Sequence, residues 1–336
     1  MMKKTGKILG VILASTLIFA GCGNTNTKTE NTDNNTEAKT YKIGVTQIAD
    51  HPSLDNCRKG FEEGLKEDGF IEGENVKIEF KSAQNDPDLA TQIAQNFVND
   101  KKDLVCGIST PSAQSLYSLC LEKNIPVVFN AISDPVAAKL AKSDTEAMEG
   151  ITGVSDALPV EAQLKLIREI LPDAKNIGIL YTTSEDNSVS TIKKYKELAG
   201  NYGFTIVEQG VVNEADLPQA IDTLLPKVDC ISNMTDNTVV NNLPLLLQKA
   251  NDKKIPVFGS EEEQVKNGCI ASAGLDYVEL GRQAGKIAAR ILKGESASDI
   301  PYETLKESKI TINKKVAEGF SVPLDGEIAK TAEVVE

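Results

Sequence analysis

The chain has 336 residues, of which 40% are hydrophobic and 25% are charged, the composition of a globular rather than a disordered protein. Its formal net charge of −13 argues against nucleic acid as a partner, because nucleic-acid-binding surfaces are basic. The length is sufficient for two lobes that each have a hydrophobic core.

Residues 1–21 are predicted to be a lipoprotein signal peptide. Three lysines precede an apolar core, residues 8–20, which is shorter than the roughly 20 residues that a membrane span needs. The small residues before Cys22 resemble the bacterial lipoprotein signal, in which the cysteine is lipidated, although Phe19 stands where leucine is usual. A plain cleaved signal with a chance cysteine is the alternative. Residues 22–40, rich in Asn, Thr and Glu, are predicted to be a flexible tether.

From residue 41 onward, short apolar segments alternate with amphipathic ones. The segments expected to be strands are residues 41–46, 76–80, 104–108, 125–130, 150–154, 176–181, 204–207, 230–234, 269–273 and 309–312. Helices are expected at residues 55–68, 88–100, 110–120, 159–171, 189–199, 217–225, 239–250 and 278–292. This alternation predicts an α/β fold with two doubly wound, mostly parallel-sheet lobes joined by a hinge.

The second half of the chain repeats the first. The segments 42–45, 69–70, 88–89 and 125–127 recur about 130 residues later, at 176–179, 203–204, 216–217 and 255–257. The repeat predicts a first lobe of residues 41–153 plus 276–305 and a second lobe of residues 154–275 plus 306–336. A ligand between the lobes could be held from both sides by the ends of the strands.

One strand-to-helix turn has the features of an anion site. The apolar strand 104–108 ends just before Thr110, a good N-cap, and Pro111 suits the first helical position. The free amides at such a helix start can hold a carboxylate or a phosphate, although an ordinary turn would have the same sequence. The segment 229–239 repeats this layout and places Asp236 where Thr110 lies in the first lobe.

Other short polar residues also follow predicted strands, and parallel strands bring such residues to one edge of a sheet. Hydroxyls and helix starts suit a carboxylate, and aspartates suit an ammonium, so an α-amino acid is the expected ligand. The residues predicted to bind it are Gln47, His51, Ser109, Thr110, Ser112, Ala113, Asp134, Asp156, Ser184, Asn187, Asp236, Asn237 and Thr238. Taken singly, each such polar residue is more often a cap or turn residue than a ligand contact, and His51 can equally be a surface residue that begins a helix.

Enzymatic function is not expected. His51 is the only histidine, and the chain contains no G-x-S-x-G, H-E-x-x-H, phosphate-loop or G-x-G-x-x-G motif, so neither a cofactor nor a metal is expected. The odd number of cysteines beyond Cys22 and the lack of C-x-x-C indicate buried apolar residues, with one disulfide pair left open. These cysteines are Cys57, Cys106, Cys120, Cys230 and Cys269.

Several of these segments resemble the tryptophan-binding lipoprotein family of bacterial ABC importers. The similar motifs are residues 47–55, 109–114, 132–135, 150–156, 181–187 and 236–238, in order, within a similarity that runs from about residue 41 to 294. The resemblance implies a type I periplasmic-binding fold and an aromatic amino acid, tryptophan or phenylalanine, as ligand. It also implies a monomer that is lipid-anchored on the extracytoplasmic face of the cell membrane and has an ABC permease as partner.

The acidic loop 261–263 departs from the less charged loop expected in the family. A sensory lipoprotein that has the same fold and binds a small ligand without transporting it is the alternative function.

Overall fold

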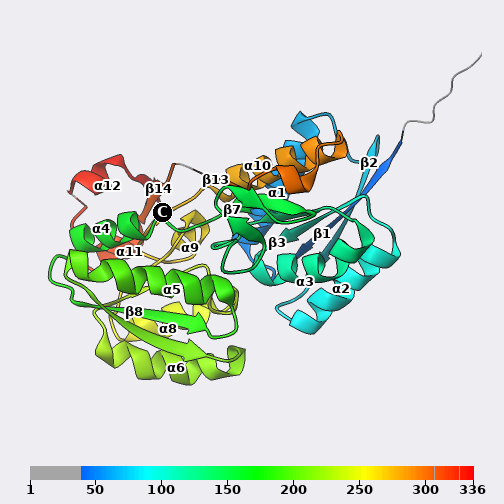
Figure 1. The fold of residues 1–336 in the computed structure, drawn as a ribbon. Coiled ribbons are helices and arrows are strands. Elements are labelled where there is room, and N and C mark those ends of the chain that lie inside the picture. Colours follow the sequence, from blue (N-terminus) through cyan, green and yellow to red (C-terminus); the bar gives the residue numbers. More distant parts are fainter. Residues whose placement is uncertain (1–38, 306, 325) are drawn as a thin grey trace, which may run out of the picture. The chain divides into compact units, whose positions relative to one another are not determined.

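The computed structural model describes residues 39–305, 307–324 and 326–336 (Figure 1). The predicted signal peptide, Cys22 and the tether up to residue 38 lie outside the described residues. Among the described residues, no helix has the length and apolar character needed to span a bilayer.

The first lobe is built on a six-stranded, fully parallel sheet with the order β13-β7-β4-β3-β1-β2. Its strands are β1 (Tyr41–Gln47), β2 (Val76–Ser82), β3 (Leu104–Ile108), β4 (Val127–Asn130), β7 (Ile151–Ser155) and β13 (Glu303–Thr304). Its helices are α1 (Pro52–Glu67), α2 (Pro87–Asn99), α3 (Thr110–Cys120) and α10 (Tyr277–Leu292), and a small hairpin is formed by β5 (Ala141–Ser143) and β6 (Glu146–Ala147).

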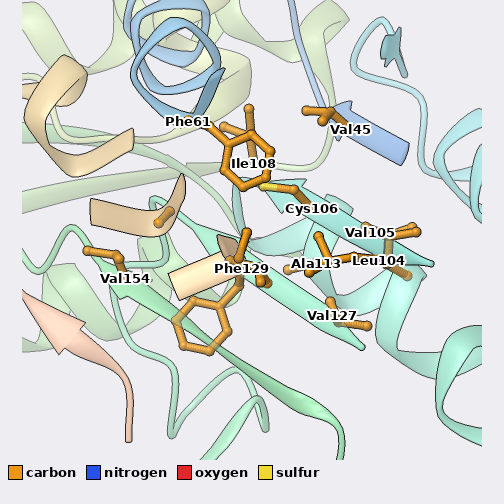
Figure 2. Close-up of a cluster of buried hydrophobic side chains, with 14 of the residues drawn as sticks. Val45, Phe61, Leu104, Val105, Cys106, Ile108, Ala113, Val127, Phe129 and Val154 are labelled. Atoms are coloured by element: carbon orange, nitrogen blue, oxygen red, sulfur yellow. The ribbon is translucent and has the colours of Figure 1, made fainter. Parts of the chain in front are cut away.

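The centre of the first lobe is packed on both faces of the sheet. All residues of β3 and β4 are buried, as the continuous apolar sequence of residues 104–108 predicts for a central parallel strand. Figure 2 shows Phe61 of α1 close to Cys106 and Ile108 of β3, with Phe129 of β4 nearby. The sheet is therefore a rigid support for the loops that follow its strands.

The second lobe contains a parallel sheet with the order β11-β10-β8-β9 and a smaller mixed sheet with the order β12-β14-β15. Its strands are β8 (Asn176–Thr182), β9 (Thr205–Val211), β10 (Cys230–Ser232), β11 (Val257–Phe258), β12 (Ala271–Gly274), β14 (Lys309–Asn313) and β15 (Glu333–Val335). Its helices are α4 (Val160–Ile170), α5 (Asp186–Leu198), α6 (Leu217–Leu224), α7 (Asn237–Asn241), α8 (Leu243–Asp252), α9 (Glu262–Lys266), α11 (Lys314–Gly319) and α12 (Glu327–Thr331). The predicted α/β fold with mostly parallel sheets is confirmed.

The internal repeat is present in the structure. The orders β2-β1-β3-β4 and β9-β8-β10-β11 are equivalent. The carboxylate of Asp103 accepts a hydrogen bond from the amide of Lys42 at 2.8 Å, and that of Asp229 accepts one from the amide of Asn176 at 2.8 Å. Each aspartate thus ties the start of one strand to its neighbour, which explains why the sequence repeats an aspartate there.

Helix α10 follows a strand of the second lobe but packs against α1 of the first (Figure 1). Gly60 and Gly64 of α1 face Gly281 and Gly285 of α10, and a Cβ atom on any of them would overlap backbone atoms of the opposite helix. Glycine is required at these positions because the two helix backbones are in contact. The close packing holds the returning segment of the chain on the first lobe.

The five cysteines among the described residues are all buried and free. Burial in apolar surroundings raises the pKa of the Cys106 and Cys230 thiols, which lie inside strands β3 and β10. These thiols are packing residues in the two lobes.

Candidate ligand-binding site

A cavity lies between the ends of the strands in the two lobes. It contains about 360 Å³ of space that no protein atom fills, including its solvent-open part. Its lining residues are His51, Ser53, Leu54, Ser109, Thr110, Ala131, Ser133, Asp156, Asn187, Thr235, Asn237, Val240, Glu261, Gln264 and Tyr277. They follow the carboxyl ends of strands or lie in the first turns of the next helices, where parallel α/β proteins bind ligands.

The cavity brings together only part of the predicted site. The predicted residues that line it are His51, Ser109, Thr110, Asp156, Asn187 and Asn237. The predicted residues that do not line it are Gln47, Ser112, Ala113, Asp134, Ser184, Asp236 and Thr238.

Local contacts explain most of these differences. The side-chain amide of Gln47 donates to the carbonyl of Ala49 at 3.0 Å instead of to the cavity. Asp134 accepts a hydrogen bond from the amide of Ala137 at 2.9 Å and so closes a turn, and Ser184 is exposed. Ser112 and Ala113 are buried inside the first turn of α3, and Thr238 is turned toward Glu185.

Ser109 and Thr110 form the start of α3 and carry buried hydroxyls without a hydrogen-bond partner in the described chain. Ser109 has a φ of 81°, an unfavourable backbone conformation for a residue with a side chain, and its amide donates to the carbonyl of Asn130 at 2.9 Å. A strained turn with two unused hydroxyls is suited to hold oxygen atoms of a ligand.

Asp156 provides a buried carboxylate in the cavity lining, where Ser109 and Thr110 provide hydroxyl donors. Its two oxygens accept hydrogen bonds from the Ser133 hydroxyl at 2.9 Å and the Tyr277 hydroxyl at 2.7 Å. Burial raises the pKa of Asp156, and these two hydrogen bonds oppose the rise by favouring the charged form. The carboxylate is therefore fixed in place and accessible to a cationic group.

Glu261 is a second carboxylate in the cavity wall, and it belongs to the acidic loop seen in the sequence. It caps α9 by accepting hydrogen bonds from the amides of Glu263 at 2.7 Å and Gln264 at 2.9 Å. Burial raises its pKa to about 7, against the effect of the two amides. The loop is thus part of the site, whereas the sequence alone showed it only as a departure from the family.

His51 lines the cavity and also begins α1, so both interpretations of this residue hold. Neither ring nitrogen meets the geometry of a full hydrogen bond with a described residue, although the side chain of Asn237 lies near enough to favour the charged ring. Burial lowers the pKa of His51 to about 4, although Asp55 and Asp50 favour the charged form. The ring is neutral at pH 7 and can either donate to or accept from a ligand.

Asp236 does not have the position expected of an ammonium-binding residue. Its side chain is completely buried and caps α7 by accepting a hydrogen bond from the amide of Val239 at 2.9 Å. It also accepts hydrogen bonds from the hydroxyls of Thr182 at 2.9 Å and Ser188 at 2.7 Å. Asp236 thus lies outside the cavity lining in this structure, and each of its oxygens accepts two hydrogen bonds from donors of the second lobe, so the structure does not bring it to the position of the predicted ligand contact.

Asn187 and Asn237 form the wall of the second lobe, and a residue behind them holds both. The carboxylate of Glu185 accepts hydrogen bonds from their side-chain amides at 3.0 Å and 2.6 Å. The Oδ1 atom of Asn187 is buried without a partner in the described chain and is available as an acceptor. Glu185 was not predicted, although it lies within a motif that the sequence singled out.

The charges of the cavity select the kind of ligand. Asp156 and Glu261 line it, and its lining includes neither lysine nor arginine. A buried carboxylate without a cationic partner is costly, so the site favours a ligand that brings a positive group. The hydroxyls at the start of α3 complement a negative group on the same ligand.

Sequence reasoning missed more than half of the lining. The missed residues are Ser53, Leu54, Ala131, Ser133, Thr235, Val240, Glu261, Gln264 and Tyr277. Most lie within a few residues of a strand end, so the position after a strand is a better signal than side-chain polarity.

Comparisons with known proteins agree with this fold. A sequence model of the family described as ABC transporter substrate binding protein matches residues 42–336. The tyrosine-binding protein of Clostridioides difficile (strain R20291) is 40% identical over 318 residues, which are 93% of this chain and 92% of that protein.

Two solved structures are similar over most of the chain. The structure of an ABC domain in complex with L-Trp from Streptococcus pneumoniae is 34% identical, covers 88% of this chain and 100% of its own, and has a TM-score of 0.85. The ligand-free, open structure of a substrate-binding protein with adhesive properties from Clostridium difficile is 38% identical, covers 88% and 99%, and has a TM-score of 0.68. The fold is therefore closer to the L-Trp complex, although the sequence is closer to the open protein.

Proposed function

Because this chain belongs to the family of ABC transporter substrate-binding proteins, we propose that it captures an aromatic L-amino acid and delivers it to a membrane permease. The observation that carries the proposal is a cavity with buried carboxylates, unpartnered hydroxyls and a lining without lysine or arginine, which suits a zwitterion. A relative named for tyrosine and a similar structure that holds L-Trp support the aromatic class. The family is one of solute-binding proteins and not of enzymes.

Each group of the ligand has a proposed partner. The ligand carboxylate accepts hydrogen bonds from the hydroxyls of Ser109 and Thr110 and from the first amides of α3. The ligand ammonium donates to Asp156, whose carboxylate is oriented by Ser133 and Tyr277. The aromatic ring packs against apolar lining residues such as Leu54 and Val240.

Titration calorimetry with L-tyrosine, L-tryptophan and L-phenylalanine tests the proposal, with L-leucine as an aliphatic control. We expect at least one aromatic amino acid to bind. Its methyl ester should bind at least about tenfold more weakly, because charge-assisted hydrogen bonds to the carboxylate are worth roughly 1.5–3 kcal/mol each. Failure of all three amino acids to bind would refute the ligand class, and equal affinity for acid and ester would refute the role of Ser109 and Thr110.

We also propose that the chain is anchored by a lipid on Cys22 at the extracytoplasmic face and works as a monomer. The basis is the sequence before Cys22, with its lysines, short apolar core and small residues. Cys22→Ser should move the protein from the membrane to the soluble fraction, measured by detergent phase partitioning. A variant that is still processed and still enters the detergent phase would contradict the lipid assignment.

An uptake experiment distinguishes a protein that delivers its ligand to a permease from a sensory protein that only binds it. Cells that lack this chain should lose uptake of the labelled ligand and recover it when the wild-type chain is restored. Unchanged uptake together with tight binding of the ligand would instead favour the sensory alternative.

A further inference from the structure

Glu185 is a buried carboxylate that lies behind the cavity and outside its lining. Glu185 is only 6% exposed, and it takes part in none of the ion pairs among the described residues. Burial, followed by the charge of Asp236, raises its pKa to about 7. A carboxylate in such a place needs hydrogen-bond donors, and their arrangement indicates what it does.

One oxygen of Glu185 orients the cavity wall. Its Oε2 atom accepts hydrogen bonds from Asn187 Nδ2 at 3.0 Å, from the amide of Asn237 at 3.0 Å and from Asn237 Nδ2 at 2.6 Å. Both asparagines line the cavity. With its amide nitrogen fixed in this way, Asn187 directs its unpartnered Oδ1 atom away from Glu185.

The other carboxylate oxygen of Glu185 is linked to the first lobe by hydrogen bonds through Thr238. The Oε1 atom accepts hydrogen bonds from the amide and the hydroxyl of Thr238, both at 3.3 Å. The same hydroxyl accepts a hydrogen bond from Asn85 Nδ2 at 3.3 Å, across the boundary between the lobes. Asn85 follows β2 in a turn with a φ of 61°, and its amide is held by the carbonyl of Ile48 at 2.6 Å.

We propose that Glu185 is a positioning residue that couples occupation of the cavity to closure of the lobes. A carboxylate is rigid, so fixing Oε2 on the two cavity asparagines also fixes Oε1. Oε1 then holds the Thr238 hydroxyl where Asn85 can reach it, and that contact exists only when the lobes are together. The inference rests on the proposed function, because ligand binding is one of its two readouts.

A double-mutant cycle on the purified chain tests the coupling, with L-tyrosine and L-tryptophan as ligands. Glu185→Gln keeps the shape of the side chain and removes the charge that accepts the donors. Asn85→Gly removes the side-chain amide that donates to Thr238 and keeps the left-handed turn, because glycine adopts that conformation freely. Gln84→Gly is the matched control, because Gln84 has a φ of 53° in the same turn and its side chain has no hydrogen bond in the described structure.

If Glu185 and Asn85 are coupled, the effects of their substitutions on ligand affinity will not multiply in the double variant. We expect Asn85→Gly to weaken binding about threefold to tenfold by faster release, as the loss of one neutral hydrogen bond does, and Gln84→Gly to leave it unchanged. Glu185→Gln should weaken binding at least about tenfold, and Asn85→Gly should add less than about twofold to that. Independent effects that multiply would overturn the coupling and leave Glu185 as a support of the cavity wall alone.

Hydrogen exchange of the Thr238 amide in the chain saturated with L-tyrosine or L-tryptophan is the second readout. Its exchange should be faster in Asn85→Gly than in Gln84→Gly, because this amide donates to Glu185 and the Thr238 hydroxyl accepts from Asn85. Equal exchange in the two saturated variants would overturn the coupling. A wild-type chain that binds neither amino acid would refute the proposed function, whereas a wild-type chain that binds, together with equal exchange in the two variants, would refute the coupling alone.

Discussion

At the scale of single residues, the structure separates two aspartates that have similar sequence surroundings. Asp156 lines the cavity, and Asp236 is enclosed by donors of its own lobe. Asp156→Asn keeps the shape and removes the charge, so we expect binding to weaken by roughly 2–5 kcal/mol, as loss of a buried charged partner does. Calorimetric titration measures this change, and an unaltered dissociation constant would remove Asp156 from the ammonium site.

Asp236→Asn should lower the stability of the fold and leave ligand binding almost unchanged. It leaves the cavity lining intact but places an amide group among the hydroxyls and amides that now donate to the carboxylate. We expect the free energy of unfolding to fall by about 1–3 kcal/mol, the cost of an unsatisfied buried polar group, while binding changes little. Denaturant unfolding and calorimetry of the same variant check both parts. A variant that unfolds like the wild type but binds weakly would reverse the roles of the two aspartates.

At the scale of secondary-structure elements, the contact between α1 and α10 depends on glycine. A Cβ atom on Gly281 would overlap the carbonyl oxygen of Cys57, so Gly281→Ala must push the helices apart. We expect a destabilisation of about 1–3 kcal/mol, typical of overpacking. Gly319→Ala in α11 is the control, because nothing lies within 4 Å of the position that a Cβ atom would take there. Equal melting temperatures for the two variants would show that the helix contact adapts without cost.

At the scale of the whole molecule, the buried carboxylates make stability depend on pH. Burial raises the folded-state pKa of Glu185 and Glu261 from 4.5 to about 7, so the folded protein holds protons between these values that the unfolded chain releases. Stability therefore falls as pH rises through this window, by at most roughly 3 kcal/mol for each group. His51 acts in the opposite direction, because its folded pKa is lowered to about 4 and stability rises with pH from there to about 6.5.

The pH prediction is tested by thermal unfolding of the ligand-free protein between pH 5 and 8. Glu261→Gln removes one of the two carboxylates and should flatten the decline of the melting temperature with pH.

Ligand binding should release protons, because an ammonium beside Asp156 lowers the pKa of that carboxyl. Calorimetry in buffers of different ionisation enthalpy measures the protons, and proton uptake on binding would contradict this account.

The sequence by itself determined the features that depend on neighbouring residues. The alternation of apolar and amphipathic segments determined the α/β fold, and the spacing of the repeated segments determined that an α/β unit occurs twice, as the two equivalent strand orders bear out. The turn at Ser109 and Thr110 was predictable to within one residue, because a strand, two hydroxyl residues and a proline follow one another in the chain; the N-cap is Ser109 and not the predicted Thr110, which is the first residue of α3. These signals are local, so one sequence suffices to find them.

Only the tertiary structure decided which carboxylates line the cavity. Asp156 is oriented by Tyr277, 121 residues away, and Asp236 is occupied by Thr182, 54 residues away. Whether an aspartate lines a cavity or caps a helix depends on which donors reach it, and such donors come from helices, strands and loops that are distant in the chain. Glu261 shows the same limit, because its loop is acidic in any conformation but lines the cavity only when the lobes meet.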